Sequence, residues 1–151
     1  KEVENPDFAY VVPDFRLNKQ FEKLNSLSEV YKQKVEFLCN ECCWYGCKDR
    51  RECYKTVSKQ NLGIDCTDHI CKAPYSNEGY RFSRVMESPG FISLDDILNI
   101  YVPMGYSNFK IEGRDLGNAL LLEFILYYMV KPQYQIHVRE AMYLDAMLDL
   151  F

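Results

Sequence analysis

Short apolar runs of strand length alternate along this chain with stretches of helical periodicity, and this alternation limits the folds that the chain can adopt. Strands are expected at residues 8–12, 34–39, 80–86 and 108–112. Helices are expected at residues 19–32, 50–58, 94–102, 116–130 and 132–148. Strands that are separated by helices form parallel sheets with helical crossovers. The chain is therefore predicted to be an α/β protein, in which four strands fit half of an eight-stranded barrel or a small doubly wound sheet.

The 151 residues are expected to form a single domain, residues 1–151, because 48% of them are hydrophobic and can build one core. Half of a barrel would leave its inner face and two sheet edges uncovered. We therefore expect that a further segment of the parent protein, or a second chain, completes the barrel.

Charge and cysteine content limit the classes of partner and the compartment. The net charge is −4 and no basic patch dominates, which disfavours bulk electrostatic binding of nucleic acid but leaves a local anion site open. Seven cysteines are an odd number, and the sequence shows no signal peptide, so reduced thiols and a cytoplasmic location are expected. The apolar stretch 116–130 is too short to span a bilayer and contains Glu123, so no membrane association is expected.

Most of the cysteines follow the expected strand at residues 34–39, where loops carry the chemistry of parallel α/β folds. The cysteines of this stretch are Cys39, Cys42, Cys43, Cys47 and Cys53, and the remaining two are Cys66 and Cys71. Thiolates are preferred ligands of iron–sulfur clusters and zinc, so a soft-metal site is one interpretation, which His69 could complete. A disulfide framework and buried thiols that act as small hydrophobes are the alternatives.

Polar and charged side chains stand at or just after the expected strands. They are Asp14, Arg16, Asn40, Glu41, Arg84, Lys110, Glu112 and Arg114. We expect these side chains to gather on one rim of the sheet, because the carboxyl ends of parallel strands lie at the same edge. Lys110 and Glu112 share a strand face, which is expected to point into the barrel and form a polar site. Arg114 stands before the next helix, and an ion pair between Lys110 and Glu112 that only fixes register is the alternative.

The sequence FKIEGR, at Phe109–Arg114, resembles a signature of the collagenase-like peptidase family U-32. Two further stretches are similar to members of this family. They are VVPDFRLN followed by VEFLCNECCWYGCKDRRECY, and FISLDDI before GYSNFKIEGR. The resemblance extends over roughly residues 10–130. It implies a TIM-barrel-like fold, of which this chain would be the later, C-terminal half.

The resemblance also implies several functions. Some members of the family are presumed proteases, and others bind a [4Fe–4S] cluster through four cysteines and support oxygen-independent hydroxylation of RNA bases or quinone precursors. By position, Cys42 and Cys47 match the first two cluster cysteines. The family's late cysteine, near residues 94–102, has no counterpart here, and Cys66 or Cys71 could substitute for it from the preceding loop. Cys39 and Cys53 are further candidates for the remaining two ligands. A peptidase has less support, because the sequence offers no defined pair of nucleophile and base.

We therefore predict an iron–sulfur-binding enzyme of the hydroxylating type, with a collagenase-like peptidase or a non-catalytic domain with structural cysteines or zinc as alternatives. The predicted metal ligands are Cys42, Cys47, Cys66 and Cys71. The predicted catalytic residues, which would bind a small anionic substrate or an RNA phosphate, are Lys110, Glu112 and Arg114. The predicted cofactor-binding residues are Asp14, Arg16, Asn40 and Glu41. The cofactor would be a [4Fe–4S] cluster, with zinc or no cofactor as alternatives.

Overall fold

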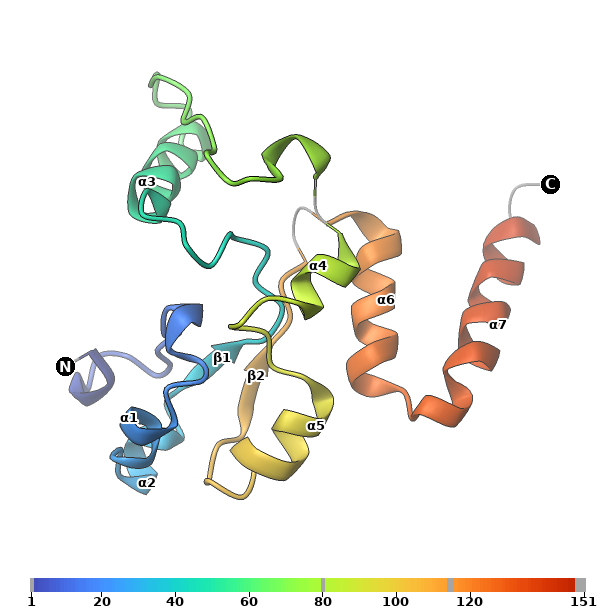
Figure 1. Cartoon of the computed structure of the whole chain (residues 1–151), viewed down its shortest axis with the longest axis horizontal. Coiled ribbons are helices and arrows are strands. Elements are labelled where there is room, and N and C mark those ends of the chain that lie inside the picture. Colours follow the sequence, from blue (N-terminus) through green and yellow to red (C-terminus); the bar gives the residue numbers. More distant parts are fainter. Residues whose placement is uncertain (1, 80, 114–115, 149–151) are drawn as a thin grey trace.

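The computed structural model describes residues 2–79, 81–113 and 116–148, and it shows a mixed α/β chain with a small parallel sheet (Figure 1). Strands β1 (Glu36–Leu38) and β2 (Asn108–Lys110) pair in parallel, with Phe37 opposite Phe109. Val11 adds an isolated parallel bridge to Val35 on the other side of β1. The predicted α/β class and parallel pairing are confirmed, whereas the half barrel stays a prediction.

Helices precede, connect and follow the two strands. They are α1 (Phe21–Asn25), α2 (Glu29–Lys32), α3 (Arg50–Asn61), α4 (Phe82–Met86), α5 (Leu94–Asp96), α6 (Gly117–Met129) and α7 (Gln135–Leu148). Short helical turns supplement them at η1 (Glu2–Glu4), η2 (Phe15–Leu17), η3 (Ser76–Glu78) and η5 (Pro132–Tyr134), while the π-helical turn η4 (Ile97–Tyr101) continues α5. Within the described part of the chain, no helix has the length and apolar character needed to cross a membrane.

Two of the predicted strands are wrong or shortened. The strand expected at residues 80–86 is the helix α4 in its described part, because Phe82 and Val85 are three residues apart and pack on one helical face toward Phe124. The ring centroids of Phe82 and Phe124 are 4.6 Å apart. The strand expected at residues 8–12 is reduced to the bridge at Val11, and Pro13, which has no N–H to donate, follows two residues later.

The predicted helix at residues 19–32 is divided into α1 and α2. Asn18, just before α1, is buried, and its amide donates to the carbonyls of Leu38 at 3.0 Å and Gly90 at 2.8 Å. The start of the helix expected at residues 94–102 is confirmed. There, Ser93 and Asp96 form a capping box with hydrogen bonds of 3.0 and 2.8 Å.

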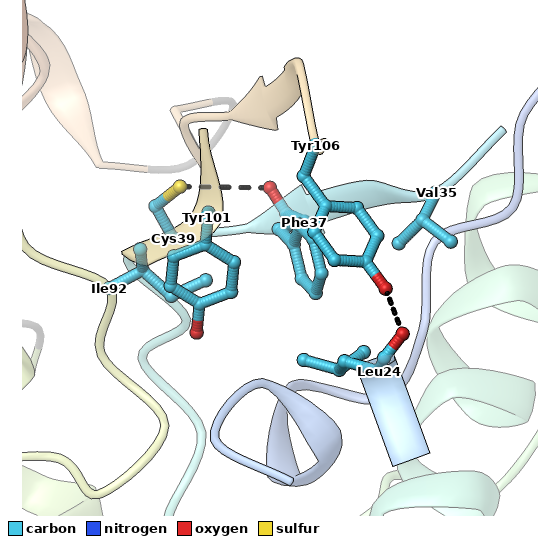
Figure 2. Packing of buried hydrophobic residues seen from close by; sticks show 7 residues of the cluster. All are labelled: Leu24, Val35, Phe37, Cys39, Ile92, Tyr101 and Tyr106. Carbon is cyan, nitrogen blue, oxygen red and sulfur yellow. Dashed lines mark hydrogen bonds between the residues drawn. The ribbon is translucent and has the colours of Figure 1, made fainter. Parts of the chain in front are cut away.

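The main core lies against one face of β1 (Figure 2). Phe37 is fully buried, and its ring centroid lies 4.9 Å from that of Tyr101 and 5.0 Å from that of Tyr106. Both tyrosine hydroxyls are satisfied, since Tyr101 donates to the carbonyl of Asn18 at 2.6 Å and Tyr106 to that of Leu24 at 2.8 Å. These contacts connect β1 with the chain before it, at Asn18 and Leu24, and with the chain after it, at Tyr101 and Tyr106. They hold β1, and the loop that follows it, in a fixed position.

The C-terminal helices lie to one side of the sheet (Figure 1). Helix α6 packs Phe124 into a second cluster with Val85 and Phe91, and Tyr128 donates a hydrogen bond of 2.7 Å to the carbonyl of Ile92. Helix α7 exposes several of its apolar residues, namely Ile136, Met142 and Leu144.

Candidate metal centre

The carboxyl ends of β1 and β2 are held together beyond the last ladder bonds by the side chain of Asn40. Its amide nitrogen donates to the carbonyl of Glu112 at 3.1 Å, and its amide oxygen accepts from the backbone N–H of Glu112 at 2.6 Å. Asn40 is fully buried, so both bonds are shielded from water. The side chain of Asn40 thus extends the hydrogen bonding between the two chain segments beyond the ends of β1 and β2, and it holds Glu112 beside the residues that follow β1.

Three potential metal ligands converge at this edge of the sheet. Ligand atoms of Glu41, Cys42 and Glu112 all lie within 4.8 Å of one another, and no other group of this kind occurs among the described residues. One carboxylate oxygen of Glu41 accepts from the backbone N–H of Cys43 at 3.0 Å, while a carboxylate oxygen of Glu112 accepts from that of Cys42 at 3.3 Å. We call these three residues the Glu–Cys–Glu triad.

The electrostatics of the site favour the neutral forms of Glu112 and Cys42 when no cation is bound. Burial, and then the charge of Glu41, raise the pKa of Glu112 above its ordinary value of 4.5. Desolvation, followed by the charges of Glu112 and Glu41, raises the pKa of the Cys42 thiol well above its ordinary value of 9.0. A divalent cation among these groups would reverse this effect, because it stabilises the carboxylates and the thiolate together.

Arg50 is the cation that balances Glu41. Its Nη2 lies 2.6 Å from a carboxylate oxygen of Glu41, whose side chain is only 2% exposed. The guanidinium lies over the rings of Phe15 and Tyr54, at 5.0 and 4.6 Å from the two centroids, and its Nε is 3.9 Å from Asp14. Its Nη1 is buried and has no hydrogen-bond partner among the described residues. An N–H left in this way typically costs about 1–3 kcal/mol.

The predicted cofactor-binding residues Asp14 and Arg16 fix the position of the cysteine loop, residues 39–49. Arg16 donates to both carboxylate oxygens of Asp14, at 2.8 and 2.6 Å, and to the carbonyl of Cys47 at 3.0 Å. The hydrogen bond from Arg16 lowers the pKa of Asp14 below its ordinary value of 3.8. Tyr45 donates from its hydroxyl to the carbonyl of Arg16 at 3.2 Å. The loop that carries the cysteines is therefore anchored at two points to the turn η2.

Most of the cysteines line one cavity of about 660 Å³, which we call the thiol cavity. The cysteines in its wall are Cys42, Cys43, Cys47, Cys53 and Cys71. They come from the cysteine loop, from α3 and from the segment between α3 and η3. His69, Arg50, Arg84 and Tyr75 also line the cavity. Among the described residues all seven cysteines are free thiols, so this structure does not form the disulfide framework.

Several thiols of the cavity are close enough to influence one another. Burial, and then the thiols of Cys71 and Cys47, raise the pKa of Cys53 above its ordinary value. Burial and the charge of Glu41 raise the pKa of Cys43 to about 11, and the guanidinium of Arg50 opposes this shift. The thiols of Cys43 and Cys53 are therefore protonated at neutral pH in the metal-free chain, and a metal would have to displace their protons.

The structure brings only part of the predicted metal set together. Cys42, Cys47 and Cys71 share the cavity, whereas Cys66 lies outside its lining and points its thiol to the carbonyl of Thr56 at 3.8 Å. Cys39 belongs to the main core. Cys43 was not among the predicted ligands and Cys53 was only a further candidate, yet both are in the cavity wall. Their place in the dense run of cysteines was the sequence signal for them.

The predicted catalytic residues are separated. Lys110 is about half exposed, and its Nζ lies 3.4 Å from Glu36 of the neighbouring strand, so Lys110 pairs with Glu36 rather than with Glu112. Glu112 belongs to the Glu–Cys–Glu triad. Arg114 lies outside the described residues. Sequence reasoning also missed Arg50, since nothing in the run Arg50–Arg51 shows which arginine turns toward Glu41.

Comparisons of the chain with protein-family models, with curated proteins and with solved structures find no match. The resemblance of Phe109–Arg114 and the cysteine loop to the U-32 family therefore stays a prediction. The geometry of the thiol cavity and of the Glu–Cys–Glu triad is the basis for the functional argument.

Proposed function

We propose that this protein is an iron–sulfur-binding enzyme, with the cluster held in the thiol cavity by Cys43, Cys47, Cys53 and Cys71. The observation that carries the proposal is that thiols from three separate segments line one cavity of about 660 Å³. Four thiolates are the usual ligand set of a [4Fe–4S] cluster. The thiols of Cys71 and Cys47 contribute, after burial, to the raised pKa of Cys53, which supports the assignment of the three cysteines to one set.

The surroundings of the cavity suit a site where thiolates form and a substrate reacts. Burial and the charge of Glu41 raise the pKa of Cys43 to about 11, and the guanidinium of Arg50 limits this rise, so a bound metal would have less proton affinity to overcome. The anchoring of the cysteine loop by Arg16 limits its movement and presents Cys47 to the cavity. A cluster would supply one-electron chemistry next to these side chains. In this proposal the enzyme is of the oxygen-independent hydroxylating type that the U-32 resemblance implies.

Purification without oxygen, followed by reconstitution with iron and sulfide, is expected to give a brown protein with about four iron and four sulfide per chain. Cys47→Ser and Cys71→Ser should each lose most of the bound iron, because serine is a poor ligand for iron in such clusters. The measurements are visible absorption and analysis of iron and acid-labile sulfide.

Cys66→Ser is the matched control, because Cys66 is a free cysteine outside the cavity lining. Its iron content is expected to equal that of the unaltered chain. A colourless, iron-free protein after anaerobic reconstitution would contradict the proposal.

A second candidate function is a single-metal site at the Glu–Cys–Glu triad, which would make the protein a zinc-type metalloprotein. The observation that favours it is the preformed arrangement, in which three ligand atoms lie within 4.8 Å of one another. Carboxylate oxygen and thiolate sulfur are both established ligands of zinc. Nothing among the described residues favours the collagenase-like peptidase over these two alternatives.

Glu112→Gln is expected to weaken binding of Zn²⁺ to the metal-free chain by at least about 10–100-fold. Losses of this size are typical when a residue that only supports a metal ligand is replaced, and Glu112 would bind the metal directly. The pKa of Glu112 lies above 4.5, so protons compete with the metal and affinity should fall as the pH is lowered from 7 toward about 5. Zn²⁺ titration by calorimetry at several pH values measures both effects.

Glu36→Gln serves as the control for this substitution, because Glu36 pairs with Lys110 and is not a member of the triad. Without metal, the raised pKa of Glu112 makes the folded chain more stable at low pH than at high pH, whereas Zn²⁺ affinity is higher at high pH. The contribution of Glu112 to folding stability is fully present below 4.5, the unfolded value, and is lost as the pH rises through the folded value. Equal Zn²⁺ affinity of Glu112→Gln and Glu36→Gln would exclude the triad as the metal site.

A further inference from the structure

We infer that the thiol cavity binds a small oxyanion, a carboxylate or a phosphate, through Arg84 and Arg50. The inference names the substrate class of the proposed enzyme and rests on that function for its meaning. The binding itself requires no cluster and can be measured on the metal-free chain. These arginines differ from the residues that the sequence assigned to an anionic substrate, namely Lys110, Glu112 and Arg114.

Arg84 is held in place on the wall of the cavity. Its guanidinium lies 3.8 Å from the centroid of the Tyr75 ring, and its Nη2 donates to a carboxylate oxygen of Glu78 at 2.5 Å. Its Nη1 is buried and has no hydrogen-bond partner among the described residues. Arg84 and Tyr75 both line the thiol cavity. The side chain is therefore preorganised, with only part of its donor capacity used.

Arg50 repeats this arrangement on the same cavity. Its guanidinium lies over the rings of Phe15 and Tyr54, its Nη2 is paired with Glu41, and its Nη1 is likewise buried without a partner among the described residues. A few side chains among the described residues have a buried polar atom without a hydrogen-bond partner. Of these, the side chains of Arg50 and Arg84 line this cavity. Two such donors beside one cavity are a deficiency that a ligand rich in acceptor oxygens removes.

The remaining lining supports an anion of small size. Lys72 and Arg81 also line the cavity, where Lys72 pairs with Asp49 at 2.8 Å and Arg81 with Glu78 at 3.5 Å, so Arg84 and Arg50 are the cations that the inference depends on. Guanidinium groups bind carboxylate and phosphate oxygens in pairs, which distinguishes such ligands from neutral molecules of similar volume. The cysteines lie in the same wall, so an anion held there would be next to the thiols. A substrate with an anionic group and a reactive part facing the thiols fits this arrangement.

The chain contains a single tryptophan, Trp44, and it lines the cavity, so its fluorescence can report binding. Titration of the metal-free chain with malonate and, separately, with inorganic phosphate is expected to give a saturable change with at least one of them. The probe that saturates identifies the source of the oxyanion. Arg84→Gln should weaken this binding by at least about tenfold. Arg139→Gln is the matched control, because Arg139 pairs with Glu123 outside the cavity.

A second measurement needs no variant. Phenylglyoxal modifies arginines, and the bound probe is expected to protect Arg84 and Arg50 but not Arg139 in the unaltered chain. Absence of saturable binding with both probes, equal binding by Arg84→Gln and Arg139→Gln, or a lack of protection would overturn the inference. These results are independent of iron content, so anion binding by a chain that fails to assemble a cluster on anaerobic reconstitution would count against the proposed function alone.

Discussion

Replacement of Arg50 by methionine is expected to lower the free energy of unfolding by about 3–5 kcal/mol, because it leaves a buried carboxylate without its cation. The side chain of Glu41 is 2% exposed, and Arg50 lies 2.6 Å from it. Removing one partner of a buried ion pair costs far more than the pair itself contributes, since the remaining charge cannot be hydrated. Urea unfolding, monitored by circular dichroism, measures the difference.

Two further variants distinguish the cost of leaving the Glu41 carboxylate buried without a cation from the cost of losing the other contacts of Arg50. The double variant Arg50→Met with Glu41→Gln removes both charges and keeps an oxygen that can accept from the N–H of Cys43, so it should recover at least half of the lost stability. Arg51→Met is the matched control, because Arg51 is exposed in the same helix, and it should change stability by less than about 0.5 kcal/mol. A loss of less than about 1 kcal/mol for Arg50→Met would contradict the assignment.

The expected gathering of polar groups at one sheet edge is reproduced in part, and the reason is local. Asn40 and Glu41 directly follow β1, and Glu112 follows β2, so parallel pairing alone brings them together. This could be predicted from strand order and alternation. Lys110 precedes Glu112 by two residues, yet it pairs with Glu36, because the register between β1 and β2 determines which charge lies nearest. That register is not visible in either strand alone.

The cavity could be predicted only in its chemistry. The density of cysteines after β1 indicated a thiol site, and it forms, but its far wall comes from residues 69–89. This segment has little regular structure, and its one expected strand is the helix α4. Side chains such as Arg84 and Tyr75 reach the cavity through tertiary contacts that no periodicity encodes. Whether a further segment or a second chain completes the sheet also stays a prediction.

Phe37 is the residue on which the position of the whole site depends, and Phe37→Ala is expected to cost about 3–5 kcal/mol. The ring is fully buried and packs against the rings of Tyr101 and Tyr106, whose centroids lie at 4.9 and 5.0 Å (Figure 2). The ring of Phe109 lies at 6.1 Å. Its removal loses the transfer free energy of the ring and leaves a cavity among rigid neighbours. The midpoint of urea unfolding should fall, while the dependence of the unfolding free energy on urea concentration stays the same, provided that the substitution does not alter the compactness of the folded or the unfolded state.

The matched control for this substitution is Phe8→Ala, because Phe8 is 46% exposed near the N-terminus and should change stability by less than about 0.5 kcal/mol. Phe37 lies three residues before Asn40, so a less rigid β1 also weakens the hydrogen bonds between Asn40 and Glu112 that hold Glu112 beside Cys42. Under conditions where Phe37→Ala remains folded, its affinity for Zn²⁺ or its iron content should therefore fall as well. Unchanged metal binding in a destabilised but folded variant would show that the site is positioned independently of this core.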